Sequence, residues 1–377
     1  MNSNNKNTIP VNESIISDEA KKNVAEALSS GWLSSGGPFV GKFETDFAKY
    51  FGTKHAVTVT NGGAALHIAL LALNIGKGDE VIVPAFTMAA PWFAVMYTGA
   101  TPVFVDCELE TFNIDPGKIE AKITPKTRAI IPVHIYGHSC DMDPILAIAK
   151  KHKLFVIEDA AEAHGGEYKG KLCGAMGDFG CFSFYANKII STGEGGMVIT
   201  NNTDWAEKAR QLKSYNFSKA KRFIHDEIGY NYRMGNLQAA VGCGELENLS
   251  VYLEKKEQMA QRYNNGLSKI AGLRLPITKP DVKNVYWMYA VLVDEKTFGM
   301  NRNELRSKLL EKNIDTRDFF YAPEDQPVLK DLLKNEKFPN AKYAGDHGLY
   351  LPSGLAITDE QIEAVIQAIK EIYEKQN

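Results

Sequence analysis

The chain has 377 residues, 44% of them hydrophobic, which suits one large α/β domain with a smaller companion and is too much for a single small core. Its 43 Lys and Arg residues against 46 Asp and Glu residues give a net charge of -3 with no basic block, which argues against a dedicated nucleic-acid-binding or membrane-surface protein. The five cysteines are scattered without a C-x-x-C pair, so a disulfide scaffold or thiolate metal cluster is not expected and the chain is predicted to be cytoplasmic.

The N-terminal stretch is polar and lacks the apolar segment of a signal peptide, and no later stretch is long and apolar enough to span a bilayer. Residues 17–30 then predict a helix that begins with Ser17 or Asp18 as its N-cap. A glycine-rich connector carrying Trp32 follows, and helical spacing resumes over residues 42–51. Trp32 is a candidate substrate contact, although an ordinary connector explains it equally well.

The first pattern typical of a binding site is a strand, a glycine pair and a helix in immediate succession. A β-branched strand over residues 56–60 turns through Asn61, Gly62 and Gly63 into a helix with an apolar stripe. Bare backbone N–H groups and the positive end of the helix dipole face such a turn, which therefore suits an anion. Neither G-x-x-x-x-G-K-[ST] nor G-x-G-x-x-G is present, so a single phosphate fits better than a nucleoside triphosphate or dinucleotide. A plain strand-to-helix turn is the alternative.

Short apolar strands then alternate with helical segments up to about residue 160. This alternation predicts βαβ units and an α/β fold with a doubly wound, mostly parallel sheet, in which sites lie at the carboxyl ends of the strands. Helices are expected over residues 89–97, 115–123 and 144–152. The residues that end the strands become site candidates, namely Asn61, Phe86 to Met88, Asp106, His134, Glu158 and Asp159.

A short run in this region, residues 134–141, contains two histidines and a cysteine, His134, His138 and Cys140. Their spacing fits no familiar zinc pattern, and no second ligand pair follows. We therefore expect no metal site and interpret the run as a loop that lines the cleft.

The most informative stretch runs from residue 154 to residue 201. Its apolar strand ends in Glu158 and Asp159, and a second aromatic-rich run delivers Lys188 into a loop rich in glycine. A carboxylate at one strand end and a lysine after the next strand are the two side chains that a pyridoxal phosphate enzyme needs, the lysine for the Schiff base and the acid for the pyridinium nitrogen. A helix-capping acid and a solvated lysine are the plainer interpretation.

A cation-rich loop follows a short helix over residues 205–212. Its cations lie near several aromatic residues and could hold a diphosphate, although a solvated surface is the alternative. They are Lys213, Lys219, Lys221 and Arg222. From residue 236 a long, interrupted helix runs toward residue 267 and links a large domain, residues 1–250 with an N-terminal arm, to a small one, residues 251–377.

The C-terminal part predicts a compact α+β domain. Its elements are a β hairpin-like run over residues 285–295, a helix over residues 301–313 and a terminal helix over residues 358–375. The intervening loop carries Arg317 and Tyr321, and we expect it to return to the cleft and contact substrate.

Taken in order, the motifs TNGG, IEDAAEAHG, FSFYANK, STGEGGMV and GYNYRM closely resemble those of the DegT-type, StrS-like nucleotide-sugar aminotransferases. The resemblance covers nearly the whole chain, and the ordered set is far more specific than any single motif. It implies the fold-type I architecture of aspartate aminotransferase. Within the family the chain looks most like the GDP-perosamine synthases.

The resemblance implies a role for each matching position. Lys188 would form the Schiff base with pyridoxal phosphate and carry the proton between the donor and the cofactor, while Asp159 would keep the ring nitrogen protonated. Further cofactor contacts would come from Glu162 near the ring hydroxyl, from Ser183, Gly62 and Gly63 at the phosphate, and from Asn231, which would reach the phosphate of the neighbouring subunit. The implied assembly is therefore a homodimer with shared active sites.

The reaction implied is a two-step exchange in which L-glutamate converts the cofactor to pyridoxamine phosphate and the amine then passes to a sugar ketone. The best-matching substrate is GDP-4-keto-6-deoxymannose, aminated at C4 to GDP-perosamine. A UDP- or dTDP-linked 4-keto or 3-keto deoxy sugar is the alternative. Two departures from the family pattern concern Met88, where an aromatic residue is usual, and Glu324, where a histidine is common.

Three other classes of protein fit the sequence less well. Related dehydratases carry a histidine in the position of Lys188. A nicotinamide-dependent oxidoreductase would show G-x-G-x-x-G after its first strand. A non-catalytic regulator on the same fold would not need both Lys188 and Asp159.

Overall fold

The computed structural model describes residues 8–218, 221, 223–225 and 227–376. Its largest sheet has seven strands in the order β1-β9-β8-β5-β4-β2-β3. Their bounds are β1 (His55–Val59), β2 (Glu80–Pro84), β3 (Thr101–Val105), β4 (Thr127–Ile130), β5 (Phe155–Asp159), β8 (Phe179–Ser183) and β9 (Gly196–Thr200). Neighbouring strands are parallel except where they pair with β9. The predicted mostly parallel α/β sheet is confirmed, with an antiparallel strand that the sequence patterns did not indicate.

The antiparallel strand β9 determines where Lys188 lies. Strands β8 and β9 are consecutive in the chain and adjacent in the sheet, so the loop between them turns back without the crossover that a parallel pair requires. This loop carries Lys188 across the carboxyl end of β8. Strand β5 is the parallel neighbour of β8, with Asp159 opposite Cys181, so the acid and the lysine reach the same edge of the sheet.

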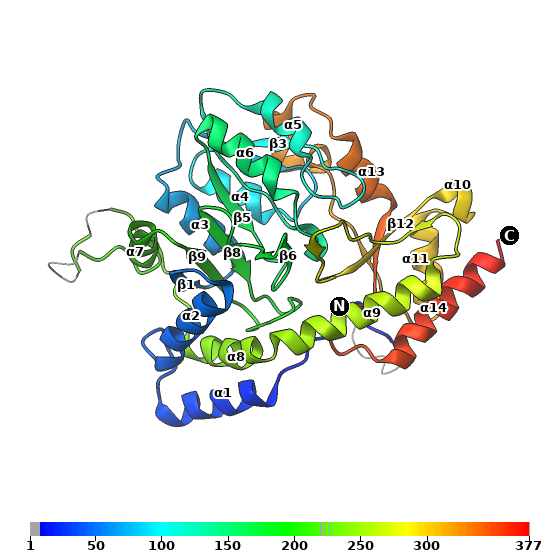
Figure 1. The fold of residues 1–377 in the computed structure, drawn as a ribbon, viewed down its shortest axis with the longest axis horizontal. Helices are drawn as coiled ribbons and strands as arrows, with labels where there is room; N and C mark the ends of the chain where they lie inside the picture. The colour runs from blue at the N-terminus through cyan, green and yellow to red at the C-terminus, as the bar shows by residue number, and fades with distance from the viewer. Residues whose placement is uncertain (1–7, 219–220, 222, 226, 377) are drawn as a thin grey trace.

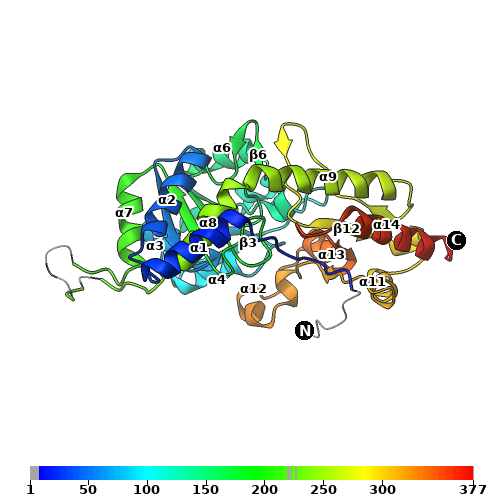
Figure 2. The same ribbon diagram turned by 90° about the horizontal axis from the view of Figure 1, so that it is seen from below.

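Helices cover both faces of the large sheet, as its alternating residues require. In β2, Ile82 belongs to a core formed with α5 (Pro116–Ile119) and α6 (Met142–His152). Its neighbours Val81 and Val83 face the opposite way, into the main core with α3 (Gly62–Ala72) and α4 (Ala90–Tyr97). Figure 2 shows α6 on one side of the molecule and α3 and α4 on the other. This layered arrangement is the doubly wound fold.

Five more helices accompany the large sheet. They are α1 (Asp18–Ser30), α2 (Pro38–Phe51), α7 (Thr203–Leu212), α8 (Asn236–Glu247) and α9 (Leu249–Leu267). Helix α1 lies against α8, and α9 continues along the same edge to the C-terminal elements (Figure 1). The α1–α8 contact is so close that a Cβ on Gly244 would lie 2.2 Å from the backbone nitrogen of Ala20. The interrupted long helix is confirmed, with its break at Asn248.

A second, antiparallel sheet of four strands has the order β10-β12-β14-β13. Its strands are β10 (Leu273–Arg274), β12 (Tyr289–Val293), β13 (Arg317–Asp318) and β14 (Gly348–Leu351). Helices α9, α11 (Arg302–Glu311) and α14 (Asp359–Glu374) enclose its core. The expected hairpin over residues 285–295 is wrong. The run forms the single strand β12, which ends just before Asp294, and its strand partners come from other segments of the chain.

The remaining elements are short. They are β6 (Glu167–Tyr168), β7 (Lys171–Leu172), β11 (Val282–Lys283), α10 (Glu295–Phe298), α12 (Lys330–Leu333), α13 (Pro339–His347) and the 3-10 turns η1 (Glu120–Lys122), η2 (Ile135–Gly137), η3 (Pro323–Asp325) and η4 (Pro327–Leu329). Side chains of the C-terminal part, among them Leu329, Phe338 and Ala341, pack into the main core. A division into residues 1–250 and 251–377 stays a proposal.

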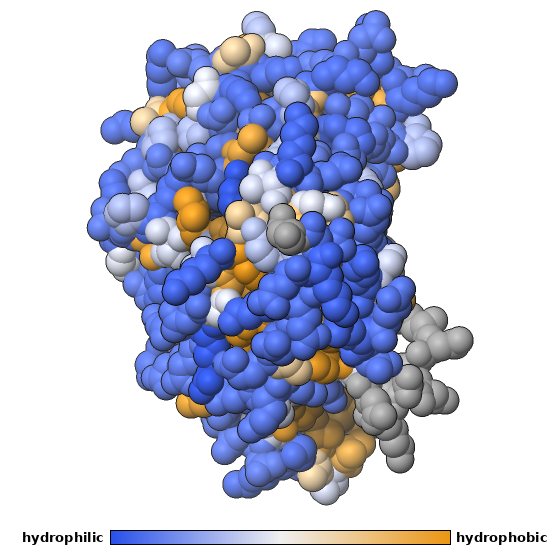
Figure 3. Space-filling model, turned by 90° about the vertical axis from the view of Figure 1, so that its right-hand side faces the viewer, coloured by the Kyte–Doolittle hydropathy of each residue, from blue (hydrophilic) through white to orange (hydrophobic). Residues whose placement is uncertain are grey.

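No helix within the described part of the chain is long and apolar enough to cross a bilayer. The face shown in Figure 3 is mostly hydrophilic, with apolar side chains gathered in an irregular band through its middle and lower part.

Candidate active site

A cavity of about 940 Å³ lies where the carboxyl ends of β5 and β8 meet the N-terminal ends of α3 and α4. It brings together most of the residues that the sequence marked as candidates. Those that line it are Asn61, Gly62, Gly63, Thr87, Met88, Asp159, Glu162, Ser183, Lys188 and Arg317. They come from five separate parts of the chain, and their convergence turns a set of motifs into one site.

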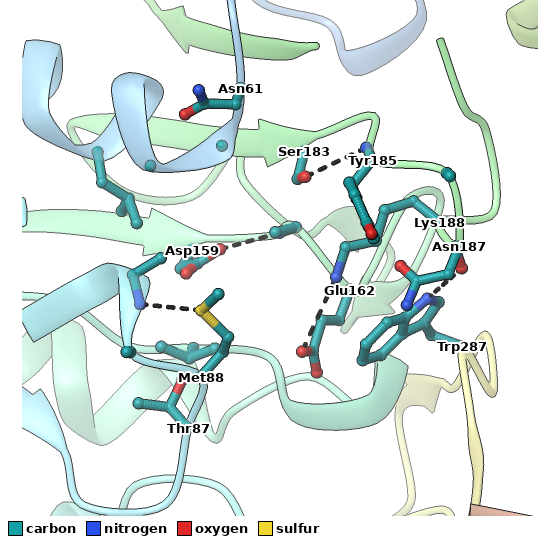
Figure 4. A pocket seen from close by; sticks show the side chains of 18 of the residues that line it. Asn61, Thr87, Met88, Asp159, Glu162, Ser183, Tyr185, Asn187, Lys188 and Trp287 are labelled. Atoms are coloured by element: carbon teal, nitrogen blue, oxygen red, sulfur yellow. Dashed lines mark hydrogen bonds and ion pairs between the residues drawn. The ribbon is translucent and has the colours of Figure 1, made fainter. Parts of the chain in front are cut away.

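Lys188 occupies the centre of this group (Figure 4). Its side chain is only 11% exposed, and its Nζ lies 4.0 Å from Oε1 of Glu162. The same Nζ lies 3.6 Å from the centre of the Trp287 ring. Burial lowers the pKa of Lys188, while the carboxylates of Glu162 and Asp159 oppose that shift. A lowered pKa makes the neutral amine, the form that can accept a proton, easier to reach.

Two buried carboxyl groups face the lysine. Asp159 ends β5, and its Oδ1 accepts a hydrogen bond from the N–H of Ala161 at 3.0 Å. Glu162 accepts one from the N–H of Tyr136 at 2.8 Å through Oε2. Burial raises the pKa of Asp159 and raises that of Glu162 to about 7, with Lys188 opposing both shifts. The site thus contains one amine and two acids whose protonation depends on one another.

Glu158, the other acid at the end of β5, faces away from the cavity because successive strand residues point to opposite faces. It is wholly buried and accepts hydrogen bonds from the N–H groups of Gly174, Met176 and Gly177. Nε2 of His134 lies 3.0 Å from its Oε2. Glu158 therefore fixes the loop that follows β7 and has no place in the site.

The run 134–141 does not line this cavity, contrary to expectation. Its polar groups bind separate partners: His134 binds Glu158, His138 binds Ser139 and Lys279, and the thiol of Cys140 donates to the carbonyl of Val133. Among the described residues, no cluster of three His, Cys, Asp or Glu side chains could hold a metal ion. The run supports the site from behind, through the N–H of Tyr136 on Glu162.

The turn at Asn61 has the geometry of an anion site. The Asn61 side chain caps α3 by accepting from the N–H of Ala64 at 2.8 Å, which leaves Gly62 and Gly63 in the first turn, where N–H groups have no partner within the helix. A Cβ on Gly62 would lie 2.7 Å from Cβ of Ser183. Only glycine therefore lets the helix N-terminus approach the Ser183 hydroxyl, and together they could hold a phosphate.

Met88 lies on the opposite wall of the cavity and is 54% exposed. Its sulfur accepts a hydrogen bond from the N–H of Ala90 at 3.0 Å, at the start of α4 (Figure 4). This contact holds the thioether at the cavity wall, where the family pattern has an aromatic ring.

The other candidates are not brought to the cavity. Trp32 is 57% exposed, and Tyr321 is 44% exposed with its hydroxyl bonded to Asp318, so neither lines the cavity of its own chain. Asn231 is also exposed, and its Oδ1 accepts hydrogen bonds from Arg233. Lys219 and Arg222 lie outside the described residues. Of the expected substrate contacts, Arg317 lines the cavity.

Two further sets of lining residues were not indicated by the sequence. Trp287 precedes β12, and its indole N–H donates to the carbonyl of Asn187 at 2.8 Å. Asn12 and Ser14 of the N-terminal segment also line the cavity. These contacts join segments far apart in the chain, so no local pattern in a single sequence marks them.

A family model for the DegT/DnrJ/EryC1/StrS aminotransferases matches residues 14–370. GDP-perosamine synthase of Escherichia coli O157:H7 is 42% identical over 97% of this chain and 98% of its own. The GDP-perosamine synthase of Caulobacter vibrioides is 44% identical over 93% of this chain and 94% of its own. The X-ray structure of DesV from S. venezuelae superposes with a TM-score of 0.89 at 38% identity, covering 94% of each chain.

Proposed function

The chain belongs to the DegT/DnrJ/EryC1/StrS aminotransferase family and is a pyridoxal phosphate-dependent sugar aminotransferase, and we propose that it moves the amino group of L-glutamate to C4 of GDP-4-keto-6-deoxymannose, giving GDP-perosamine. The observation that carries this proposal is the identity of 42% and 44% with two GDP-perosamine synthases over nearly the full chain. The cavity of about 940 Å³ is at the upper end of the range for small-molecule sites, as a sugar nucleotide requires.

The residues of the cavity fit pyridoxal phosphate. The Gly62, Gly63 and Ser183 cradle suits its phosphate, and Asp159 is a buried acid that can keep a ring nitrogen protonated. Glu162 would lie near the ring hydroxyl, and Met88 would cover one face of the ring. When bound, the cofactor supplies the electron sink for the carbanion that forms on proton removal.

Lys188 is the residue to which we assign proton transfer. It must be neutral to accept a proton at Nζ and charged to donate one. Burial favours the neutral amine, while the carboxylates of Glu162 and Asp159 favour the charged one. The cavity walls exclude bulk water from Nζ, since the side chain is only 11% exposed. The same amine can thus serve as base and as acid in both halves of the exchange.

Substrate binding requires a cation for an anionic group. Arg317, on β13, lines the cavity, and we assign it to the anionic group of the substrate. Lys219 and Arg222 stay candidates for the diphosphate on the basis of sequence. Asn231 is assigned to the phosphate site of a second subunit, so that a homodimer shares its sites.

The substrate assignment is tested by a panel of nucleotide sugars. GDP-, UDP- and dTDP-linked 4-keto-6-deoxy sugars are each offered with glutamate, and the release of 2-oxoglutarate is followed. We expect the GDP sugar to react fastest. If a dTDP or UDP sugar, or a 3-keto sugar, reacts and the GDP sugar does not, the perosamine assignment is wrong and the aminotransferase activity stands.

A further inference from the structure

The amino group of Lys188 rests on an aromatic ring that the sequence did not connect with it. Trp287 lies just before β12, in the C-terminal part of the chain, yet its ring centre is 3.6 Å from Nζ of Lys188. The tryptophan is buried, and Figure 4 shows the ring beside the lysine, across from Glu162. A cation over an indole face is attracted by the ring quadrupole, most strongly where water is excluded.

Trp287 is held at both ends. Its indole N–H donates to the carbonyl of Asn187, the residue just before Lys188. Its own carbonyl accepts a hydrogen bond from Nζ of Lys256 at 3.0 Å. The ring therefore cannot rotate away from the lysine without breaking the partly buried hydrogen bond of its indole N–H.

Lys256, on α9, is a buried lysine whose two hydrogen bonds go to the carbonyls of Trp287 and Ser353. None of the salt bridges between described residues gives it a carboxylate partner, and burial lowers its pKa to about 7. Burying a lysine costs free energy unless its amino group makes hydrogen bonds. Here they fix the backbone that carries Trp287.

The backbone that carries Lys188 is fixed as well. The carbonyl of Asn187 also accepts from the Asn12 side chain at 3.4 Å, and the Ser14 hydroxyl donates to the carbonyl of Ala186. The N-terminal segment and Trp287 thus hold the two peptide units before Lys188. The backbone that carries the Trp287 ring and the backbone that carries the Lys188 amine are thus both held by hydrogen bonds.

We propose that Trp287, anchored by Lys256, is a positioning residue for Lys188. The indole face of Trp287 holds the Lys188 amino group over the cavity while that group is free and carries a proton. The inference rests on the proposed role of Lys188. The titratable groups that act on this amine are Glu162 and Asp159, which favour its charged form, and His164, a wholly buried neighbour whose pKa is lowered to about 3. The ring adds a contribution of the same sign as the carboxylates.

The test uses the full chain freed of cofactor, so that the amine of Lys188 can be titrated directly. The pH dependence of its modification by trinitrobenzenesulfonate is followed by mass spectrometry of the Lys188 peptide. In Trp287→Leu the charged amine loses the ring, so we expect the midpoint to move to lower pH by about one unit. Trp287→Phe keeps an aromatic face and should stay within about 0.3 unit of the wild type.

Kinetics of the cofactor-loaded enzyme provide a second readout. Trp287→Leu should lower kcat by about tenfold or more and leave KM for glutamate within about threefold, because the loss concerns a group that acts after binding. Trp287→Phe should recover part of kcat. Lys256→Met should lower kcat and move the midpoint in the same direction as Trp287→Leu. The matched control is Trp205→Leu, which removes a half-buried tryptophan that packs on Phe155 and Phe179, away from the cavity.

The outcomes separate the two proposals. If borohydride fixes the cofactor to Lys188 in the wild type, and Trp287→Leu loses thermal stability like Trp205→Leu without moving the midpoint, Trp287 is only a packing residue and this inference is overturned. If borohydride does not label Lys188, the proposed function itself is refuted, independently of the result for Trp287. Should Trp287→Leu not fold, the midpoint of Lys256→Met decides, and a Lys256→Met midpoint equal to that of the wild type overturns the inference.

Discussion

The chemistry of the site depends on how three ionisable side chains share protons. Lys188 and Glu162 lie 4.0 Å apart, and Asp159 acts on both. Burial drives the amine and the acids toward their neutral forms, whereas their mutual attraction drives them toward the charged forms. Burial is the largest influence on the pKa of each of the three groups, and the opposite charges limit the shift that it causes. This balance is what a residue that is base in one step and acid in the next requires.

The covalent role of Lys188 is the first prediction at this scale. Wild-type protein with bound cofactor should absorb visible light, and borohydride reduction should fix the cofactor to the Lys188 peptide. Lys188→Ala should show neither property and should lose the transferase activity. Lys213→Ala is the control, because Lys213 is buried against Glu44 outside the cavity. A cofactor that borohydride fixes in Lys188→Ala would refute the assignment.

The second prediction concerns the phosphate cradle. In Gly62→Ala the new Cβ would lie 2.7 Å from Cβ of Ser183, so the first turn of α3 must move away from β8. Overpacking costs about 1–3 kcal/mol, and we expect cofactor affinity to fall by about 10- to 100-fold. Titration of cofactor-free protein with pyridoxal phosphate measures this change. Gly41→Ala, in α2 with open space around its Cβ position, should bind the cofactor normally, and an equal loss in both variants would contradict the cradle.

At the scale of elements, the sequence patterns worked where the cause is local. Ser17 caps α1 through the N–H of Ala20, as its position before the apolar stripe indicates. Helix α2 begins at Pro38, earlier than predicted, although proline in the first turn is a usual start signal. The patterns failed for β12, whose strand partners are distant in sequence, and for the run 134–141. The residues of that run do not line the cavity, because His134 binds Glu158 and His138 binds the carbonyl of Ser139 outside it.

His138 gives a prediction at this scale, because it joins η2 to the segment before β11. Its Nδ1 bonds the carbonyl of Ser139 at 2.8 Å, and its Nε2 accepts from the N–H of Lys279 at 3.1 Å. A ring that donates at one nitrogen and accepts at the other is neutral, and burial lowers its pKa from 6.5 to about 4. The unfolded chain therefore binds a proton between these values that the folded chain does not, and stability falls as pH drops through that window.

The pKa difference of His138 predicts a loss of about 3 kcal/mol in the free energy of unfolding between pH 7 and pH 4, at about 1.4 kcal/mol per pH unit. His138→Gln keeps an acceptor for the N–H of Lys279 and does not titrate. It should be less stable than the wild type at pH 7 and lose less stability on acidification. Urea denaturation at each pH measures both effects, with the surface variant His152→Gln as control. Parallel curves for wild type and His138→Gln would rule out this origin.

At the scale of the whole molecule, the site draws on segments that the chain separates widely. The N-terminal segment pairs with the C-terminal part through Ile9 and Ile314 and then passes behind Lys188 at Ser14. The glycine turn, the β5 acids and the lysine loop could be predicted because each has a local motif. Trp287, Lys256 and Asn12 could not, because their places depend on how the two sheets pack. Met88, Tyr97 and Tyr185 line the cavity and are themselves exposed.

Subunit complementation is the prediction that follows. Asn231 is exposed, does not line the cavity of its own chain and pairs with Ser214, just after α7. If it serves the partner's phosphate site, Lys188→Ala and Asn231→Ala homodimers should each be inactive or weak. A mixed dimer would contain one site with both native residues, so refolding the two variants together in equal amounts should restore about a quarter of wild-type activity. Activity that stays at the sum of the separate variants would place Asn231 and Lys188 in the same subunit's site, because no mixed dimer could then contain an intact one.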